Sequence, residues 1–73
     1  MIYKEKILIC GATGFIGRNL LEYYIKQNKY SIRAVYHKRP ALEEYNVEWI
    51  KADLKNPEDV KNALKDVDIV LQF

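Results

Sequence analysis

Four short stretches of the chain are rich in apolar, β-branched or aromatic residues, and each predicts a β-strand. The first runs from about Lys6 to Cys10, and its unbroken apolar residues indicate burial on both faces, as in a parallel sheet. Ser31–Tyr36 and Val47–Lys51 are expected to form the second and third strands. Ile69–Leu71 predicts a fourth buried strand, which stops at Phe73.

The stretches between these strands carry helical patterns or start signals. From Phe15 or Ile16 to about Gln27, apolar residues recur every three or four positions, which predicts an amphipathic helix. Asn56-Pro57-Glu58-Asp59 has the form of a helix start, with Asn as N-cap, Pro at the first helical position and acids in the first turn. This second helix is expected to continue to about Lys65. Ala41–Asn46 has room for about a turn and a half of helix.

This order of elements predicts an α/β fold. Strands that alternate with such connections form a parallel sheet with right-handed crossovers. We therefore expect a Rossmann-type parallel sheet with strand order 3-2-1-4, the first half of a doubly wound dinucleotide-binding fold. A complete domain of this type needs about 150 residues, and an apolar fourth strand needs cover on both faces. Residues 1–73 are expected to be the N-terminal part of such a domain, truncated after the fourth strand.

Composition narrows the class of protein. With 49% hydrophobic and 30% charged residues, the chain is not of the disordered class. The formal net charge of +2 is too small to predict a nucleic-acid or membrane partner, and no apolar run approaches the roughly 18 residues of a spanning helix. The single cysteine, Cys10, excludes an internal disulfide and indicates a reducing, cytoplasmic compartment. We expect it to be a small buried residue rather than a reactive thiol. One His and one Cys predict no metal site.

The candidate chemistry lies where the first strand ends. Three glycines follow it at three-residue intervals, and the helical pattern begins at once. Glycine permits a sharp turn and the close approach of another group, and the N–H groups and dipole of a helix start favour a phosphate. A glycine-rich turn between a buried strand and a helix is therefore a dinucleotide-binding signature. The residues expected at the pyrophosphate are Gly11, Thr13, Gly14, Phe15, Ile16 and Gly17.

The spacing G-x-x-G-x-x-G in Gly11–Gly17 resembles the short-chain dehydrogenase/reductase superfamily. With its Gly-Phe-Ile-Gly, the motif is similar to that of the extended branch, the NAD-dependent epimerase/dehydratase family of nucleotide-sugar enzymes. The resemblance covers the whole chain and includes Asp53-Leu54 after the third strand. It implies that Asp53 accepts a hydrogen bond from the adenine amine, with Leu54 against the ring. The other interpretation of Asp53 is that it closes a turn.

The sequence departs from this family pattern at two places. Cys10 stands where threonine is usual, which matters little because the backbone shapes the turn. NAD-using members carry an acid at the end of the second strand, whereas this chain has His37-Lys38-Arg39. A guanidinium can bind a 2′-phosphate through two parallel hydrogen bonds. We therefore expect NADP, with NAD as the alternative, held by Arg39 with Lys38 or His37 assisting, since Arg33 lies within the strand. A solvated loop is the other interpretation.

No catalytic residue is predicted within this chain. The superfamily's catalytic pair is Tyr-x-x-x-Lys, and no tyrosine of the chain has a lysine four positions later. The resemblance implies the cofactor-binding part of a nucleotide-sugar epimerase, dehydratase or reductase, whose C-terminal part binds the substrate and which forms a homodimer. Two alternatives remain. The first shares the Gly-Ala-Thr-Gly start with this chain, and the second shares only the binding of the cofactor. One is an atypical reductase, isoflavone-reductase-like or flavin-reductase-like, and the other is a non-catalytic NAD(P)-sensing regulator.

Overall fold

The computed structural model describes residues 4–72, which form one parallel sheet with a helix on each face. In chain order, the elements are β1 (Lys6–Cys10), α1 (Phe15–Gln27), β2 (Ser31–Tyr36), β3 (Glu48–Lys51), α2 (Pro57–Ala63) and β4 (Ile69–Gln72). The strands pair in the order β3-β2-β1-β4, all parallel, which confirms the predicted fold class and strand order. The expected end of the fourth strand at Phe73 lies outside the described residues.

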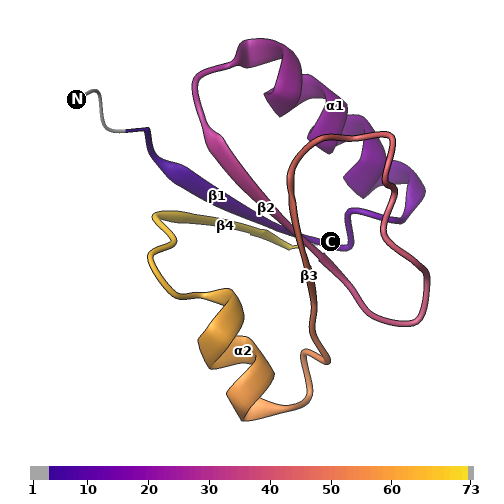
Figure 1. The fold of residues 1–73 in the computed structure, drawn as a ribbon, viewed down its shortest axis with the longest axis vertical. Helices are drawn as coiled ribbons and strands as arrows, with labels where there is room; N and C mark the ends of the chain where they lie inside the picture. Colours follow the sequence, from indigo (N-terminus) through magenta and orange to yellow (C-terminus); the bar gives the residue numbers. More distant parts are fainter. Residues whose placement is uncertain (1–3, 73) are drawn as a thin grey trace.

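The two helices lie on opposite faces of the sheet, and the connection between β2 and β3 runs on the side of α1 (Figure 1). Because successive side chains of a strand point to opposite faces, each strand contributes to two cores. Ile7, Ile9 and Leu21 belong to the core beneath α1. Leu8 and Cys10 belong to the core beneath α2. Cys10 is only 4% exposed and burial raises its pKa, so the expectation of a small buried residue is confirmed.

The helix expected within Ala41–Asn46 is absent, and that prediction is wrong. The segment holds a single turn, in which the Tyr45 amide donates to the Leu42 carbonyl at 3.0 Å. Six residues allow too few helical hydrogen bonds to offset the cost of fixing the first turn. The segment is held from outside instead, because the indole Nε1 of Trp49 donates to the Tyr45 carbonyl at 3.1 Å.

The bounds of β1, α1 and β2 agree with expectation, and the boundaries that differ do so by one or two residues. The third strand begins at Glu48 rather than Val47, and α2 ends at Ala63 rather than Lys65. A side chain from β2 fixes the end of α2. Nη1 of Arg33 donates to the carbonyls of Ala63 (2.7 Å) and Lys65 (2.9 Å), which takes up acceptors that a helix end leaves free.

The expectation that the fourth strand is buried on both faces is wrong for one face. Ile69 and Leu71 pack against the core beneath α1, but Val70 on the other face is 48% exposed. A hollow of about 360 Å³, with Val60 and Leu64 of α2 among its lining residues, lies beside Val70. The cause is the place of β4 at the edge of the sheet, where α2 covers only part of the face. Neither helix within residues 4–72 is long and apolar enough to cross a membrane.

Candidate functional site

The residues predicted to bind a ligand lie together at the carboxyl edge of the sheet, where β1, β2 and β3 end. They line two neighbouring clefts. The glycine cleft, of about 530 Å³, is lined by Gly11, Thr13, Gly14, Phe15, Ile16, Gly17 and Arg39. The basic cleft, of about 560 Å³, is lined by His37, Lys38, Arg39, Asp53 and Leu54, with Gly11, Thr13 and further residues. Every predicted site residue therefore lines one or both clefts, at the edge where open parallel sheets bind ligands.

Two of the three glycines are required by the chain itself. Gly11 has a φ of 80°, a left-handed conformation that makes the turn after β1 and that L side chains rarely adopt. At Gly17, a Cβ would stand 1.9 Å from the Gly11 carbonyl oxygen, so only glycine allows α1 to approach the turn this closely. These two residues set the shape of the glycine cleft.

Gly14 differs, because neither its backbone nor its neighbours require a glycine. Its φ of −82° and ψ of 173° are open to any residue, and a Cβ would make only an ordinary contact, 3.4 Å from the Gly11 carbonyl oxygen. Gly14 nevertheless lines the glycine cleft directly below the start of α1. The missing side chain leaves room for a group that lies in the cleft, which fits the close approach of a phosphate.

The first turn of α1 presents backbone donors at the same place. Gly14 is the N-cap, and within residues 4–72 no side chain hydrogen-bonds to this helix start and no acid occupies its first turn. The first amide to donate within the helix is that of Arg18, to the Gly14 carbonyl at 2.8 Å. The N–H groups of Phe15, Ile16 and Gly17 precede it, so they are available to an anion.

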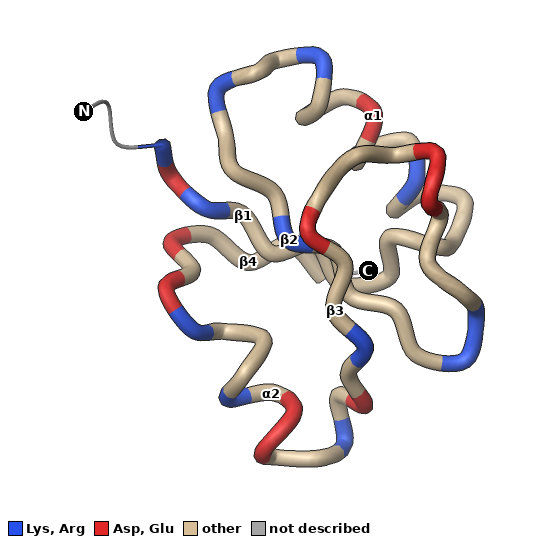
Figure 2. Tube along the Cα trace, viewed as in Figure 1, with Lys and Arg blue, Asp and Glu red and all other residues tan. Residues whose placement is uncertain are grey.

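The connection after β2 carries only basic charges along its first part (Figure 2). His37, Lys38 and Arg39 are all exposed, and Arg39 lines both clefts. A guanidinium at this position can reach an anion in either cleft. The arrangement fits a ligand with negative groups at two separate points.

Arg33, the other arginine of this region, is directed elsewhere. It is 7% exposed, and besides its two bonds to the end of α2 its Nε lies 3.2 Å from Oε2 of Glu48. Partial desolvation raises the pKa of Glu48, but hydrogen bonds and ion pairs with Lys6 and Arg33 outweigh it and lower that pKa overall. Arg33 is therefore engaged within the fold, in accord with the preference for Arg39 as a ligand-binding residue.

Asp53 closes a turn and also lines the basic cleft. Its Oδ1 accepts a hydrogen bond from the Lys55 amide at 2.9 Å, and its own amide donates to Oδ2 of Asp59 at 2.9 Å. Its Oδ2 lies 4.0 Å from Nε2 of His37, which lines the same cleft. Leu54 is 43% exposed beside it. The interpretation of Asp53 as closing a turn is therefore confirmed, and Asp53 is also part of the lining of the basic cleft.

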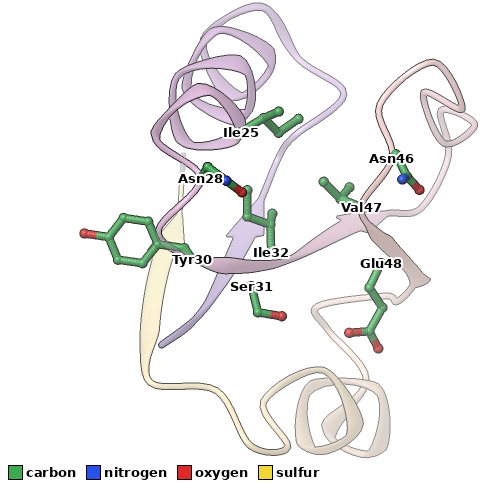
Figure 3. Close-up of a pocket in the computed structure, with 8 residues that line it drawn as sticks. All are labelled: Ile25, Asn28, Tyr30, Ser31, Ile32, Asn46, Val47 and Glu48. Carbon is green, nitrogen blue, oxygen red and sulfur yellow. The ribbon is translucent and has the colours of Figure 1, made fainter. Parts of the chain in front are cut away.

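Some residues that line the basic cleft were not predicted from the sequence, among them Tyr36 and Lys55. Lys55 follows Asp53 by two residues in the same turn, so its position beside the cleft could have been predicted from the sequence. A further hollow of about 510 Å³ lies at the opposite, amino edge of the sheet, between the end of α1 and the starts of β2 and β3 (Figure 3). None of the predicted site residues lines it.

Comparison with known proteins agrees with the geometry. A family model described as NAD(P)H-binding matches residues 11–72, which begin at the first glycine of the cleft. Isoflavone reductase homolog A622 of Nicotiana glauca is 35% identical over 78 residues, covering 93% of this chain and 25% of that protein. The NmrA-like family domain-containing oxidoreductase flvB of Aspergillus flavus is 36% identical over 70 residues, covering 90% of this chain and 23% of that protein.

A solved structure supports the fold alone. The "putative 3-oxoacyl-reductase" of Bacillus thuringiensis superposes with a TM-score of 0.73 at 20% identity, covering 96% of this chain and 36% of that one. The chain spans about a quarter of the length of the curated relatives named above. Because the family model covers residues 11–72, which include the glycine turn, both helices and the strands β2, β3 and β4, the chain belongs to the NAD(P)H-binding family.

Proposed function

We propose that this chain is the N-terminal, dinucleotide-binding part of an NADP-dependent oxidoreductase similar to isoflavone reductases. The observation that carries the proposal is Gly14, a glycine with no structural need of its own, set in a cleft beneath the uncapped start of α1. The nicotinamide, when bound, supplies or accepts a hydride. The residues of this chain bind and orient the other parts of the cofactor.

Three parts of the dinucleotide, all apart from the nicotinamide, have a proposed position. The pyrophosphate lies in the glycine cleft over Gly11–Gly17, with Thr13 on the wall and the amides of Phe15 and Ile16 as donors. The adenine lies against Leu54, with its amine donating to Asp53. The 2′-phosphate of NADP lies at Arg39, with His37 and Lys38 beside it, because these groups are exposed and no acid occupies that connection before Glu43.

The two most informative relatives favour a reductase over the other candidates. Their names describe a reductase homologue and an oxidoreductase. A nucleotide-sugar epimerase or dehydratase is the second candidate, because Gly-Phe-Ile-Gly and Asp53-Leu54 match that family's motifs. In either case the substrate and the catalytic groups would be held outside residues 1–73. We further propose a homodimer and, from the single buried Cys10, a cytoplasmic location.

Cofactor choice is tested by titrating the full-length protein with NADPH and NADH and following nicotinamide fluorescence. We expect NADPH to bind about tenfold more tightly, since a hydrogen bond to a charged group contributes about 1.5–3 kcal/mol. Arg39→Ala should bring the two affinities close together. The matched control is Lys61→Ala, which removes an exposed cation on α2 away from both clefts. Equal affinities in the wild type, or a preference for NADH that survives Arg39→Ala, would make the basic connection an ordinary solvated loop.

The reaction class is tested by cofactor consumption. A reductase oxidises one NADPH for each product molecule, whereas an epimerase returns the hydride and leaves the cofactor unchanged. We expect a fall in NADPH absorbance with carbonyl or enone substrates and no conversion of nucleotide sugars. Conversion of a nucleotide sugar without net oxidation would favour the second candidate. Dinucleotide binding without turnover of either class would favour a regulator.

A further inference from the structure

His37 and Asp53 lie close to each other in the lining of the basic cleft. They follow the ends of the neighbouring parallel strands β2 and β3, whose register pairs Tyr36 with Lys51. Their side chains are 44% and 42% exposed, and Nε2 of His37 lies 4.0 Å from Oδ2 of Asp53. A small rotation of either exposed side chain would bring the two atoms into hydrogen-bond distance. The pair therefore stands at the place where the adenosine of the dinucleotide is proposed to bind.

One carboxylate oxygen of Asp53 is the proposed acceptor for two competing donors. Oδ1 is held by the Lys55 amide at 2.9 Å, within the turn that Asp53 closes. Oδ2 is the oxygen on the side of His37, and it is the acceptor proposed for the adenine amine. An imidazolium paired with Oδ2 would weaken that acceptor. A neutral imidazole competes much less, because hydrogen bonds between charged groups are about twice as strong as neutral ones.

The charges around His37 decide where its imidazolium goes. Asp53 is the acid nearest to it, and Asp59 lies behind Asp53 through the bond to its amide. Lys38 and Arg39 on its own connection, and Lys55 on the facing turn, line the same cleft, with the Tyr36 phenol. A 2′-phosphate would add about two negative charges among these cations. It is therefore a stronger partner for the imidazolium than a carboxylate already held in a turn.

We infer that His37 makes the choice between NADP and NAD depend on pH, because its imidazolium exchanges between Asp53 and the 2′-phosphate. The inference rests on the proposed function of the two clefts. With NAD, acid conditions pair His37 with Asp53 and weaken the hold on adenine. With NADP, the imidazolium turns to the phosphate and leaves Asp53 to the adenine. Protonation of the imidazole creates the charge that the two acceptors compete for, so selectivity for NADP rises as pH falls.

The test measures the dissociation constants of NADP⁺ and NAD⁺ by calorimetry at pH 6 and pH 8, at constant ionic strength, for the full-length protein and two variants. His37→Gln keeps an uncharged nitrogen near the place of Nε2. Asp53→Asn removes the charge and keeps one carbonyl oxygen, so it presents an acceptor at one of the two oxygen positions and an NH2 donor at the other. Because a phosphate monoester itself titrates near about pH 6, the quantity compared is the NADP/NAD affinity ratio of the wild type divided by that of His37→Gln at the same pH.

We expect this quotient to be about fivefold larger at pH 6 than at pH 8, the effect of one half-exposed ion pair at the upper end of its usual strength. The loss of NAD⁺ affinity on acidification should disappear in Asp53→Asn. A quotient that is the same at both pH values would overturn the inference while leaving the proposed function intact. Failure of both dinucleotides to bind at either pH would overturn the proposed function, and the inference with it.

Discussion

The two helices of this chain begin at the same edge of the sheet, but their first turns are satisfied in opposite ways. At α2, Oδ1 of Asn56 accepts hydrogen bonds from the amides of Glu58 (2.9 Å) and Asp59 (3.5 Å), and those two acids lie in the first turn. At α1, the N-cap is Gly14, and among the described residues no side chain caps the turn and no acid lies in it. The chain neutralises the positive end of one helix and leaves that of the other for a ligand.

This difference shows how a small fold separates stability from binding. The start of α2 is complete without any other molecule, so its residues contribute to folding. The start of α1 lacks this stabilising side-chain cap, and its glycines shape a cleft instead. Within the glycine turn the same division recurs, because Gly17 is demanded by packing and Gly14 is not. Substitutions at the two helix starts should therefore affect different properties of the protein.

The largest effect is expected at Gly17, where packing alone decides. Gly17→Ala places a Cβ 1.9 Å from the Gly11 carbonyl oxygen, so α1 has to move away from the turn. We expect the free energy of unfolding to fall by about 3 kcal/mol or more, measured by urea denaturation. Gly14→Ala is the matched control and should lose less than about 1 kcal/mol, because its Cβ makes an ordinary contact. Equal stability of Gly17→Ala and the wild type would show that the contact is not as close as described.

Gly14→Val should affect the affinity for dinucleotide more than the fold. The branched side chain would occupy the lining of the glycine cleft and keep the proposed pyrophosphate from the amides of Phe15 and Ile16. We expect binding to weaken by about 2–3 kcal/mol, the contribution of one or two hydrogen bonds to a charged group. The measurement is calorimetric titration of the full-length variant after its folding has been verified by circular dichroism. Unchanged affinity would remove the pyrophosphate from this cleft.

The features that could be predicted from sequence depend on local patterns or on the geometry common to all parallel sheets. The strand order followed from the alternation of elements, and the cap of α2 from Asn56-Pro57. The site residues share one edge because the carboxyl ends of parallel strands always do. The buried role of Arg33, the open face beside Val70 and the approach of His37 to Asp53 depend on contacts between distant segments. No local pattern encodes such contacts.

Asp53 has a role in the fold and a proposed role in binding, so its substitution tests whether one residue can serve both. Asp53→Ala removes the acceptor proposed for adenine and also the bond from the Lys55 amide. We expect dinucleotide affinity to fall by about 1–2 kcal/mol, the scale of one hydrogen bond that involves a charged group. Asp53→Asn, which keeps an acceptor for only one of the two partners, should recover part of the loss. If titration of Asp53→Ala shows reduced stability but no specific binding defect, Asp53 has only its structural role.

The smallest effect is expected at Asn56, whose side chain serves α2 alone. Asn56→Ala leaves the amides of Glu58 and Asp59 without their cap, which typically costs about 1 kcal/mol of stability. Asn56→Asp should retain the cap, because a carboxylate accepts the same hydrogen bonds and also suits the helix dipole. Dinucleotide affinity should stay at the wild-type value in both variants, since Asn56 lines neither cleft. An effect of Asn56 on the basic cleft could pass through Asp59, whose Oδ2 accepts a hydrogen bond from the Asp53 amide. If Asn56→Ala weakened dinucleotide binding as much as Gly14→Val does, the two helix starts would not act independently. The start of α2 would then contribute to binding as well as to stability.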